Sequence, residues 1–399
     1  MSRVVLVLNA GSSSLKYSLV EGDTGDALAG GLVERIGESA GVLTHRGPSG
    51  ETRLEQPIGS HEDALGLVLD TFAEHGPPLD DGLHLAAIGH RVVHGGDRFA
   101  DPVLITDELV DEVRDLIPLA PLHNPANLEG IEVARRMFPD LPQVAVFDTA
   151  FHQTLPPEAY TYAVPRAWTR DHGVRRYGFH GTSHAFVSRE AARLLGRDPA
   201  EVNVIVLHLG NGASATAVRG GRSVDTSMGM TPLEGLVMGT RSGDLDPALH
   251  AHLHREAGWS IEEIDRALTR DAGLKGLAGE NDFRELRRMV AEGDEAAQLA
   301  FDVYCYRIRK YVGAYTAVLG RVDAIVFTAG VGQHSPPVRA TSLSGLEALG
   351  IELDEALNDA ATGREAVVVS TPGSRVAVMV VPTNEEWEIA RQALAVVPA

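Results

Sequence analysis

A glycine-rich turn between two apolar segments occurs twice in this chain, and the copies lie half a chain apart. Residues 204–218 comprise a β-branched run, the turn 210–212 and a returning apolar segment. Residues 4–20 repeat this order around a turn that begins at Gly11, half of the 399-residue chain before Gly210. A repeat of this length is not that of a solenoid. It predicts two similar α/β domains that face each other across a cleft, each offering one hairpin to a ligand.

The residue types in these turns favour phosphate binding. Glycine and asparagine tolerate positive φ, and we expect such angles at 210–212 because tight hairpins use them. A turn of this kind points backbone N–H groups outward, where they can hold an anion. The serine triplet 12–14 and Lys16 add hydroxyl groups and a positive charge beside the first turn. A single hairpin turn is usually only a turn, so the prediction depends on the pair.

Composition limits the partners of the protein. The chain has 55 acidic and 35 basic residues and a formal net charge of −20, which argues against nucleic acid or an anionic membrane surface as partner. No apolar run reaches membrane-spanning length, and the N-terminus lacks a signal-peptide pattern. The single cysteine, Cys305, excludes a disulfide framework. We expect a cytoplasmic enzyme in which arginines of glycine-rich loops attract an anionic substrate.

Hydrophobic periodicity and turn residues predict alternating strands and helices in both halves. Strands are expected at 31–36, 85–93, 144–149 and 323–329, and helices at 61–75, 107–117, 124–137, 184–195 and 301–319. We expect Asn124 to cap its helix, a glycine turn at 330–332, and a capping box formed by Thr383 and Glu386. The first domain is predicted at 1–149, with a C-terminal helix at 384–399 packing back on it, and the second at 150–383.

Four residues in loops or at predicted strand ends carry the predicted chemistry: Arg91, Asp148, His180 and Arg241. Arg241 stands in the loop 225–247, which has no periodicity, and long loops of compact domains are commonly functional. Arginine grips carboxylates and phosphates bidentately. A single arginine is more often part of a surface salt bridge, but two of them with two phosphate-binding hairpins indicate phosphoryl transfer onto or from an anion. His180 and His184 match the spacing of a zinc pair, but no third ligand is visible, and we expect His184 to hydrogen-bond at a helix start.

The chain is similar to the acetate kinase family in five segments that follow one another in order, 9–16, 90–96, 179–184, 225–235 and 238–244. These motifs are long, and the resemblance extends over essentially the whole chain. The family belongs to the superfamily of actin-like ATPases and sugar kinases. The resemblance therefore implies two duplicated α/β domains of the actin-like, ribonuclease H-like kind with an interdomain cleft, in agreement with the half-chain repeat.

The resemblance also implies a reaction. It is reversible phosphoryl transfer from ATP to acetate, which gives acetyl phosphate and ADP by direct in-line attack of the carboxylate. Arg91 and Arg241 would bind the carboxylate and the transferring phosphoryl group. His180 would donate to the transition state, and Asp148 would orient an arginine or the histidine.

Further roles follow from the same resemblance. Asn9 and Glu385 would help to hold Mg²⁺, for which Mn²⁺ could substitute. The apolar wall around the methyl group would consist of Val93, Leu122, Phe179 and Pro232. ATP would be contacted by Ser12, Lys16, His208, Leu209, Gly210, Asn211, Gly212, Asp282, Phe283, Arg284, Gly330, Val331, Gly332, Gln333 and His334. A homodimer is implied by the family and by no feature of the sequence.

One loop departs from the family pattern. Where the family usually has Gly-Ile-Gly-Glu-Asn, residues 330–334 of this chain are Gly-Val-Gly-Gln-His. The two glycines that permit close backbone approach remain. The change therefore bears on nucleotide-base preference and leaves the predicted reaction intact.

Three alternatives remain open. A sugar or other hydroxyl kinase of the same superfamily would use Asp148 as a base, although two arginines beside an apolar pocket argue against it. A propionate or butyrate kinase would differ in the pocket, where the branched side chain of Val93 should shorten the space. A non-enzymatic filament protein or regulator would leave Arg91 and His180 unexplained.

Overall fold

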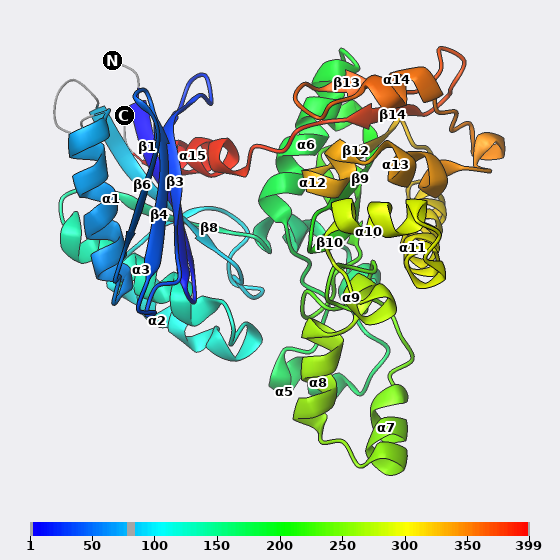
Figure 1. Cartoon of the computed structure of the whole chain (residues 1–399), viewed down its shortest axis with the longest axis horizontal. Coiled ribbons are helices and arrows are strands. Elements are labelled where there is room, and N and C mark those ends of the chain that lie inside the picture. The colour runs from blue at the N-terminus through cyan, green and yellow to red at the C-terminus, as the bar shows by residue number, and fades with distance from the viewer. Residues whose placement is uncertain (1–2, 78–83, 398–399) are drawn as a thin grey trace. The chain divides into compact units, whose positions relative to one another are not determined.

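The structure is a computed structural model that describes residues 3–77 and 84–397. The packing of the chain divides it into two units, of which unit 1 comprises residues 1–153 and 384–399 and unit 2 comprises residues 154–383. Figure 1 shows both units with their elements labelled. The C-terminal helix α15 (Glu385–Val396) belongs to unit 1, although the whole of unit 2 separates it from the rest of that unit in sequence.

Unit 1 is built on a mixed sheet whose described strands follow the order β5-β4-β3-β2-β1-β6-β8-β7. β1 pairs antiparallel with β2 and parallel with β6, and β6 pairs parallel with β8. The strands are β1 (Arg3–Gly11), β2 (Ser14–Glu21), β3 (Ala27–Glu34), β4 (Gly41–Gly47), β5 (Gly50–Gln56), β6 (His84–Val92), β7 (Val103–Leu104) and β8 (Gln143–Phe147). The carboxyl ends of β1, β6 and β8 thus lie at one edge, where ligands bind in open α/β sheets.

Both faces of this sheet are apolar because helices cover both. Along β1, Leu6 and Leu8 join a core with residues of α1 (His61–His75) and α3 (Asn124–Met137). The alternate residues Val5 and Val7 join a second core with residues of α15, as the period of two in a strand requires. A third cluster packs α2 (Asp107–Asp115) and α3 against the ends of β6 and β8. Figure 1 shows α1 and α3 on one side of the sheet and α15 on the other.

Unit 2 contains a second mixed sheet with the strand order β11-β10-β9-β12-β14-β13. β9 pairs antiparallel with β10 and parallel with β12, and β12 pairs parallel with β14. α6 (Gly181–Leu194) packs against β9 and β12, and α11 (Glu295–Leu319) packs against β9 and β10. The strands are β9 (Asn203–Leu209), β10 (Ala213–Arg219), β11 (Arg222–Thr226), β12 (Ala324–Thr328), β13 (Val367–Val368) and β14 (Ala377–Val380).

The two sheets repeat one topology. In each, an antiparallel meander (β3-β2-β1 and β11-β10-β9) is extended by two parallel strands (β6-β8 and β12-β14). The turn after β1 and the turn after β9 therefore occupy corresponding places in the two units. The predicted duplication of an α/β domain is confirmed.

The other helices are shorter than α11. They are α4 (Pro157–Tyr160), α5 (Arg166–His172), α7 (Leu249–Ala257), α8 (Ile261–Arg270), α9 (Gly273–Ala278), α10 (Phe283–Ala291), α12 (Ala329–His334), α13 (Pro336–Leu343) and α14 (Glu355–Ala360), with 3₁₀ turns at Ile117–Leu119, Ala150–Thr154, Pro199–Glu201 and Glu347–Leu349. Within the described ranges, no helix combines the length and the apolar character needed to cross a lipid bilayer.

Helices α1 and α3 begin and end at the predicted residues, but two predicted caps are wrong. Asn124 is the first residue of α3, and its side chain bonds the backbone of His94. The hydroxyl of Thr383 donates to Ser183, and the side chain of Asn384 caps α15 instead. Asn124 and Thr383 are engaged by groups distant in sequence, which a local pattern cannot reveal.

Two predictions about glycine turns are also wrong. Neither Gly210 nor Gly212 has a positive φ. The turn closes with the N–H of Gly210 donating to the carbonyl of Gly212 at 3.0 Å, and a Cβ added at Gly210 would lie 3.2 Å from that oxygen. Glycine at 210 therefore allows the backbone of residue 212 to come close, and it is not needed for a positive φ. Gly330 and Gly332 lie in the short helix α12, where a turn was expected.

Arg176 holds the irregular loop 227–248, which connects β11 to α7. Its guanidinium donates to the three successive carbonyls of residues 226–228 and forms an ion pair with Glu234 at 2.5 Å. The hydroxyl of Tyr162 also donates to Glu234. Burial opposes the charge of Arg176, but Glu234 more than compensates and raises the pKa of the guanidinium. This arrangement fixes the start of the loop that contains Arg241.

We predict that Arg176→Ala lowers the free energy of unfolding by ~3 kcal/mol, since it leaves Glu234 without its cation and three carbonyls without a donor. Glu234 is 33% exposed, which limits the cost. The double variant Arg176→Met/Glu234→Gln should lose less, because no charge is left unpaired. Urea unfolding of the three proteins at neutral pH measures this. An Arg176→Ala protein that unfolds at the wild-type urea concentration would contradict the prediction.

Candidate functional site

A bidentate ion pair joins the ends of β6 and β8 in unit 1. Nε of Arg91 donates to Oδ1 of Asp148 at 3.0 Å, and Nη2 donates to Oδ2 at 2.5 Å. The side chain of Asp148 is 1% exposed and that of Arg91 is 20% exposed. Burial alone would lower the pKa of Arg91, but Asp148 and the nearby carboxylates of Glu385 and Glu386 raise it above its ordinary value. Arg91 is therefore charged, oriented and partly accessible.

Polar groups from β1, β2 and the start of α15 lie beside this pair. Oδ1 of Asn9 accepts from Nη1 of Arg91 at 3.4 Å, and Lys16 forms an ion pair with Glu386. Burial raises the pKa of Glu385, while the positive charges of Arg91 and Lys16 partly offset this effect. The structure thus brings together, within unit 1, the predicted residues Asn9, Lys16, Arg91, Asp148 and Glu385.

The predicted metal ligands are the amide oxygen of Asn9 and the carboxylate of Glu385. Among the described residues, no group of three or more His, Cys, Asp or Glu side chains could hold a metal ion. Mg²⁺ in kinases is commonly held by one or two protein oxygens, with water and phosphate oxygens completing its shell. Asn9 and Glu385 both interact with the same guanidinium. An amide oxygen and a carboxylate around one guanidinium are ligand types that fit Mg²⁺ bound together with a nucleotide.

Buried polar side chains fix the loop that follows β6. Asn127 of α3 donates to the carbonyl of Ala10 at 2.7 Å and accepts from the N–H of Val93 at 2.9 Å. It ties the end of β1 to a predicted wall residue. Asn124 and Thr149 bond the backbone of the next two residues of the loop. The sequence analysis missed this scaffold, for which the available signal is two asparagines at the start of a helix that is otherwise buried.

The predicted wall residues differ in burial. Val93 and Leu122 belong to unit 1, and Phe179 and Pro232 to unit 2. Val93 and Phe179 are buried, whereas Leu122 is 63% exposed. Ser12, a predicted phosphate contact, is exposed in the β1–β2 turn.

Arg241 and His180 meet at the β9–β10 turn of unit 2. A Cβ added at Gly212 would lie 3.6 Å from Nη1 of Arg241 and 3.7 Å from Cε1 of His180. Nη1 of Arg241 donates to the carbonyl of Pro232 at 2.9 Å. Burial lowers the pKa of Arg241, and no carboxylate of the described chain forms an ion pair with it. The turn therefore presents a cation that pairs with no carboxylate in the part of the chain that the structure describes.

His180 has a strained backbone. Its φ of 57° and ψ of 28° lie in the left-handed region, which residues other than glycine seldom adopt. It immediately precedes α6, and its ring stacks on that of His208. Strain of this kind persists where the surroundings hold it and is concentrated at functional sites.

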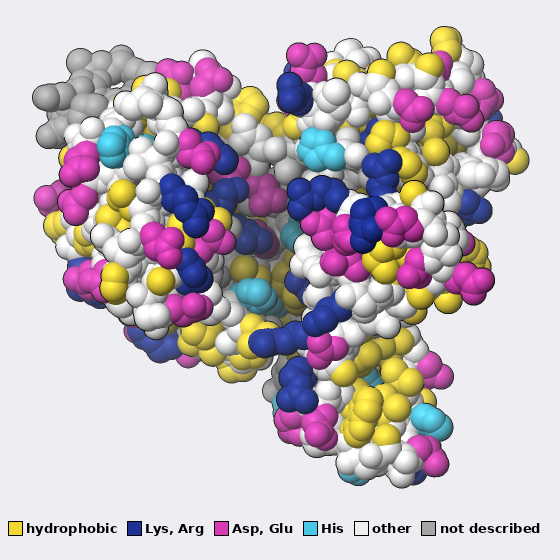
Figure 2. Space-filling view, viewed as in Figure 1, with side chains coloured by type: hydrophobic (Ala, Val, Ile, Leu, Met, Phe, Trp, Pro, Cys, Tyr) yellow, Lys and Arg dark blue, Asp and Glu magenta, His cyan; other side chains and the backbone are white. Residues whose placement is uncertain are grey.

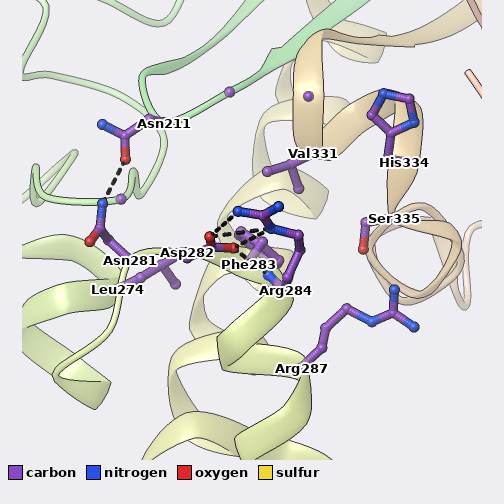
Figure 3. A pocket seen from close by; sticks show the side chains of 13 residues that line it. Asn211, Leu274, Asn281, Asp282, Phe283, Arg284, Arg287, Val331, His334 and Ser335 are labelled. Carbon is purple, nitrogen blue, oxygen red and sulfur yellow. Dashed lines mark hydrogen bonds and ion pairs between the residues drawn. The ribbon is translucent and has the colours of Figure 1, made fainter. Parts of the chain in front are cut away.

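A pocket of about 380 Å³ lies at the same turn, bordered by α9, α10 and α12 (Figure 3). Nδ2 of Asn281 donates to Oδ1 of Asn211 at 3.2 Å, and Arg284 pairs with Asp282 at 2.6 Å. A Cβ added at Gly239 would lie 1.9 Å from Oδ1 of Asn211, so a larger residue there would displace the side chain of Asn211. The size and the mixture of apolar and polar groups suit a nucleoside-sized ligand.

Eight of the predicted ATP contacts line this pocket: Gly210, Asn211, Asp282, Phe283, Arg284, Gly330, Val331 and His334. Seven predicted contacts do not line it: Ser12, Lys16, His208, Leu209, Gly212, Gly332 and Gln333. Five lining residues were not predicted: Gly239, Leu274, Asn281, Arg287 and Ser335. Gly239 and Asn281 stand directly beside predicted residues or motifs, and their proximity in sequence was the available signal.

Charged side chains near the pocket pair with one another along α10. Arg284 binds Asp282, and Arg288 binds Glu285. Figure 2 shows basic and acidic side chains interspersed in this region. Arg287 lines the pocket and forms no ion pair with any described residue. One cation of α10 therefore remains at the rim of the pocket for a polar or anionic ligand.

Comparison with known proteins accords with this geometry. The chain matches the acetokinase family over residues 4–391. An acetate kinase of Streptomyces coelicolor is 60% identical over 395 residues, which cover 98% of this chain and 97% of that protein. The crystal structure of Porphyromonas gingivalis acetate kinase has a TM-score of 0.95 at 44% identity and covers 99% of this chain and 100% of that one. The crystal structure of a propionate kinase from Francisella tularensis has a TM-score of 0.92 at 42% identity and covers 98% of each chain. Because the match spans nearly the whole chain and the relatives align along their full length, this protein belongs to the acetokinase family.

Proposed function

We propose that this protein is an acetate kinase, which transfers the γ-phosphoryl group of ATP to acetate and gives acetyl phosphate and ADP in a reversible reaction. Its membership of the acetokinase family supports this, as does the 60% identity to a protein named acetate kinase. The observation that carries the proposal is the half-buried Arg241, without an ion-pair partner in the described part of the chain, at a turn that borders a nucleoside-sized pocket. Such a cation calls for an anion from outside the protein.

A carboxylate acceptor suits the chemistry of these groups. Acetate is ionised at neutral pH and can attack a phosphoryl group without a general base. Both carboxylate oxygens of Asp148 accept from Arg91, which disfavours Asp148 as the base that a hydroxyl acceptor would need. Catalysis then consists of alignment and charge neutralisation. In the proposed reaction Arg91 and Arg241 bind the carboxylate and the phosphoryl group, and His180 donates to the phosphoryl oxygens.

The proposed reaction requires a divalent cation. Asn9 and Glu385 would hold Mg²⁺, or Mn²⁺ in its place. When bound, the cation supplies positive charge to the phosphate oxygens and so weakens their repulsion of an incoming anion. Lys16 and Ser12 of the β1–β2 hairpin would add contacts to phosphate. As the family resemblance implies, the proposal also includes a homodimer in the cytoplasm.

A propionate kinase is the second candidate. The 42% identity to a propionate kinase of known structure over 98% of each chain favours it. The two activities differ by one methylene in the acceptor, so the apolar wall decides between them. We assign the wall to Val93, Leu122, Phe179 and Pro232. The buried, branched side chain of Val93 leaves less room for a longer acid than a smaller residue would.

Incubation of the protein with ATP, Mg²⁺, acetate and hydroxylamine should yield acetyl hydroxamate, because hydroxylamine traps an acyl phosphate. Propionate should react with a kcat/KM roughly 10–200-fold lower, since one methylene in an apolar pocket is worth about 1–3 kcal/mol. Glucose should consume no ATP, and EDTA should abolish the reaction. A hydroxamate yield equal to that of a control without protein would refute the proposed function. A higher kcat/KM for propionate would select the second candidate.

Val93→Ala should raise the kcat/KM ratio of propionate to acetate by about tenfold, because removing the branched side chain lengthens the pocket. Val133→Ala is the matched control, since Val133 is equally buried but lies in the core formed with α1. The ratio should be unchanged in the control. If both variants leave the ratio at its wild-type value, Val93 does not belong to the wall.

His180→Ala should lower kcat by roughly 10²–10³ with little change in the KM of acetate, as expected for a donor that acts mainly in the transition state. Arg91→Ala and Arg241→Ala should lower kcat further, by roughly 10³–10⁵. Arg255→Ala, on the exposed part of α7, is the control and should keep wild-type kinetics. Far-ultraviolet circular dichroism establishes that each variant is folded. A folded His180→Ala protein with wild-type kcat would assign His180 a structural role only.

A further inference from the structure

Three histidine rings and two serine hydroxyls meet at the β9–β10 turn of unit 2. We call His180, His184 and His208 the histidine cluster. Nδ1 of His180 and Nε2 of His184 both contact Oγ of Ser214, at 2.9 and 2.7 Å. Nδ1 of His208 contacts Oγ of Ser183 at 2.8 Å. The rings of His180 and His208 stack with their centroids 4.2 Å apart.

The number of protons at Ser214 limits how these rings can be protonated. A hydroxyl group has one hydrogen to donate and accepts through its oxygen. Ser214 can therefore donate to only one of the two ring nitrogens that contact it, and the other nitrogen must be an N–H that donates to Oγ. If Ser214 donates to one of these two rings while both are neutral, its hydrogen goes either to Nδ1 of His180 or to Nε2 of His184.

The proposed function favours one of these arrangements at His180. Its Cε1, the ring carbon between Nδ1 and Nε2, lies beside Gly212 together with the guanidinium of Arg241. Because Nδ1 contacts Ser214, Nε2 is the ring nitrogen that would meet a ligand at this turn. In the proposed function a phosphoryl group is bound here. An N–H at Nε2 would donate to its oxygens, whereas a bare nitrogen lone pair would repel them. Only donation from Ser214 to Nδ1 places the hydrogen of a neutral His180 on Nε2.

His208 is held in a similar way. The hydroxyl of Thr383 donates to Oγ of Ser183 at 2.9 Å, which leaves the hydrogen of Ser183 for Nδ1 of His208. Nε2 of His208 lies 4.0 Å from a Cβ added at Gly210 and so faces the same turn. His208 and Ser214 are directly opposite each other in the β9–β10 ladder. The ladder therefore places His208 beside the serine that His180 contacts.

We propose that Ser214, with His184 donating to it, is a positioning residue that keeps His180 in the tautomer with hydrogen on Nε2, and that Ser183 and Thr383 do the same for His208. The stacked rings then present two N–H groups to the turn. This inference rests on the proposed function for the choice of tautomer, but the tautomer can be measured without any activity. Ser214 and Ser183 are fully buried, so water cannot readily take their place.

Nitrogen-15 NMR of protein labelled at histidine tests the tautomer directly, because a protonated and an unprotonated ring nitrogen have separate chemical shifts. The signals of His180 are assigned by their loss in His180→Ala. In the wild type, Nε2 of His180 should be protonated and Nδ1 should not. In Ser214→Ala, the Nδ1–H tautomer of His180 should become populated. A wild-type His180 with hydrogen on Nδ1 would overturn the proposal.

Kinetics of the same variants test the consequence. Ser214→Ala should lower kcat by about 10–10²-fold, as for other residues that orient a functional histidine, with the KM of acetate and ATP unchanged. Ser188→Ala is the matched control, since Ser188 is a buried serine of α6 whose hydroxyl donates to the backbone carbonyl of Ala185 in its own helix. It should keep both the wild-type tautomer and the wild-type kcat. Equal loss of kcat in the two variants would mark the effect as structural and overturn the proposal.

A second pair of variants decides the matter if Ser214→Ala does not fold. The amide of His184→Gln can still donate to Ser214, whereas His184→Ala cannot. The proposal expects the first to keep the Nε2–H tautomer of His180 and the second to lose it, and equal tautomer populations in both would overturn it. A protein without kinase activity whose His180 tautomer still depends on Ser214 would refute the proposed function and leave the positioning role standing.

Discussion

Keeping a half-buried guanidinium without an anion beside it costs free energy, and unit 2 contains the means to hold Arg241 in that state. Its hydrogen-bond acceptors among the described residues are neutral, namely the carbonyl of Pro232 and the sulfur of Met238. The loop on which it lies is fixed at its start by Arg176, whose own charge is balanced by Glu234. The ion pair therefore stabilises the loop, while the unpaired cation stays available to a ligand. The buried charge of Arg241 is unfavourable in the free protein, and a bound anion would reduce this cost.

The two arginines of the proposed reaction are held by opposite means. Arg91 is neutralised by Asp148 in a bidentate pair, and further carboxylates lie near it. Arg241 has no such neighbour within the described ranges. The two sheets share one topology, yet the charges beside the two arginines differ. The groups around each arginine come mainly from loops and helix starts, which are not part of the duplicated strands. The common fold thus supplies two corresponding turns, and the added segments give each its own charge.

Sequence reasoning succeeded where a pattern is local or repeated and failed where a side chain acts at a distance. The bounds of α1 and α3 and the duplicated topology follow from periodicity and from the half-chain repeat. The caps at Asn124 and Thr383 were wrong because each side chain bonds a group far away in sequence. The prediction of a positive φ at Gly210 was wrong because the missing side chain there makes room for the backbone of residue 212.

The same limit applies to the candidate site. Glycine-rich loops and the family motifs identified most residues that line the pocket, since these residues are contiguous in the chain. The residues that hold the site were missed. Asn127 bonds Ala10 and Val93, which are distant from it and from each other in sequence, and Ser214 joins two histidines of a helix start to a strand. No spacing rule connects such partners, because only the folded chain brings them together.

The hydrogen-bonding roles at the site favour an acceptor that is already an anion. A hydroxyl acceptor would need a base, but both oxygens of Asp148 accept from Arg91. In the proposed arrangement Nδ1 of His180 and Nδ1 of His208 each accept from a serine hydroxyl, so these two rings offer N–H groups where a base would need lone pairs. Among the described residues, Asp148 in unit 1 and the rings of His180 and His208 in unit 2 are thus not arranged to accept a proton. Such a set can stabilise charge on a phosphoryl group while a carboxylate attacks it, and it gives no help to a group that must first lose a proton.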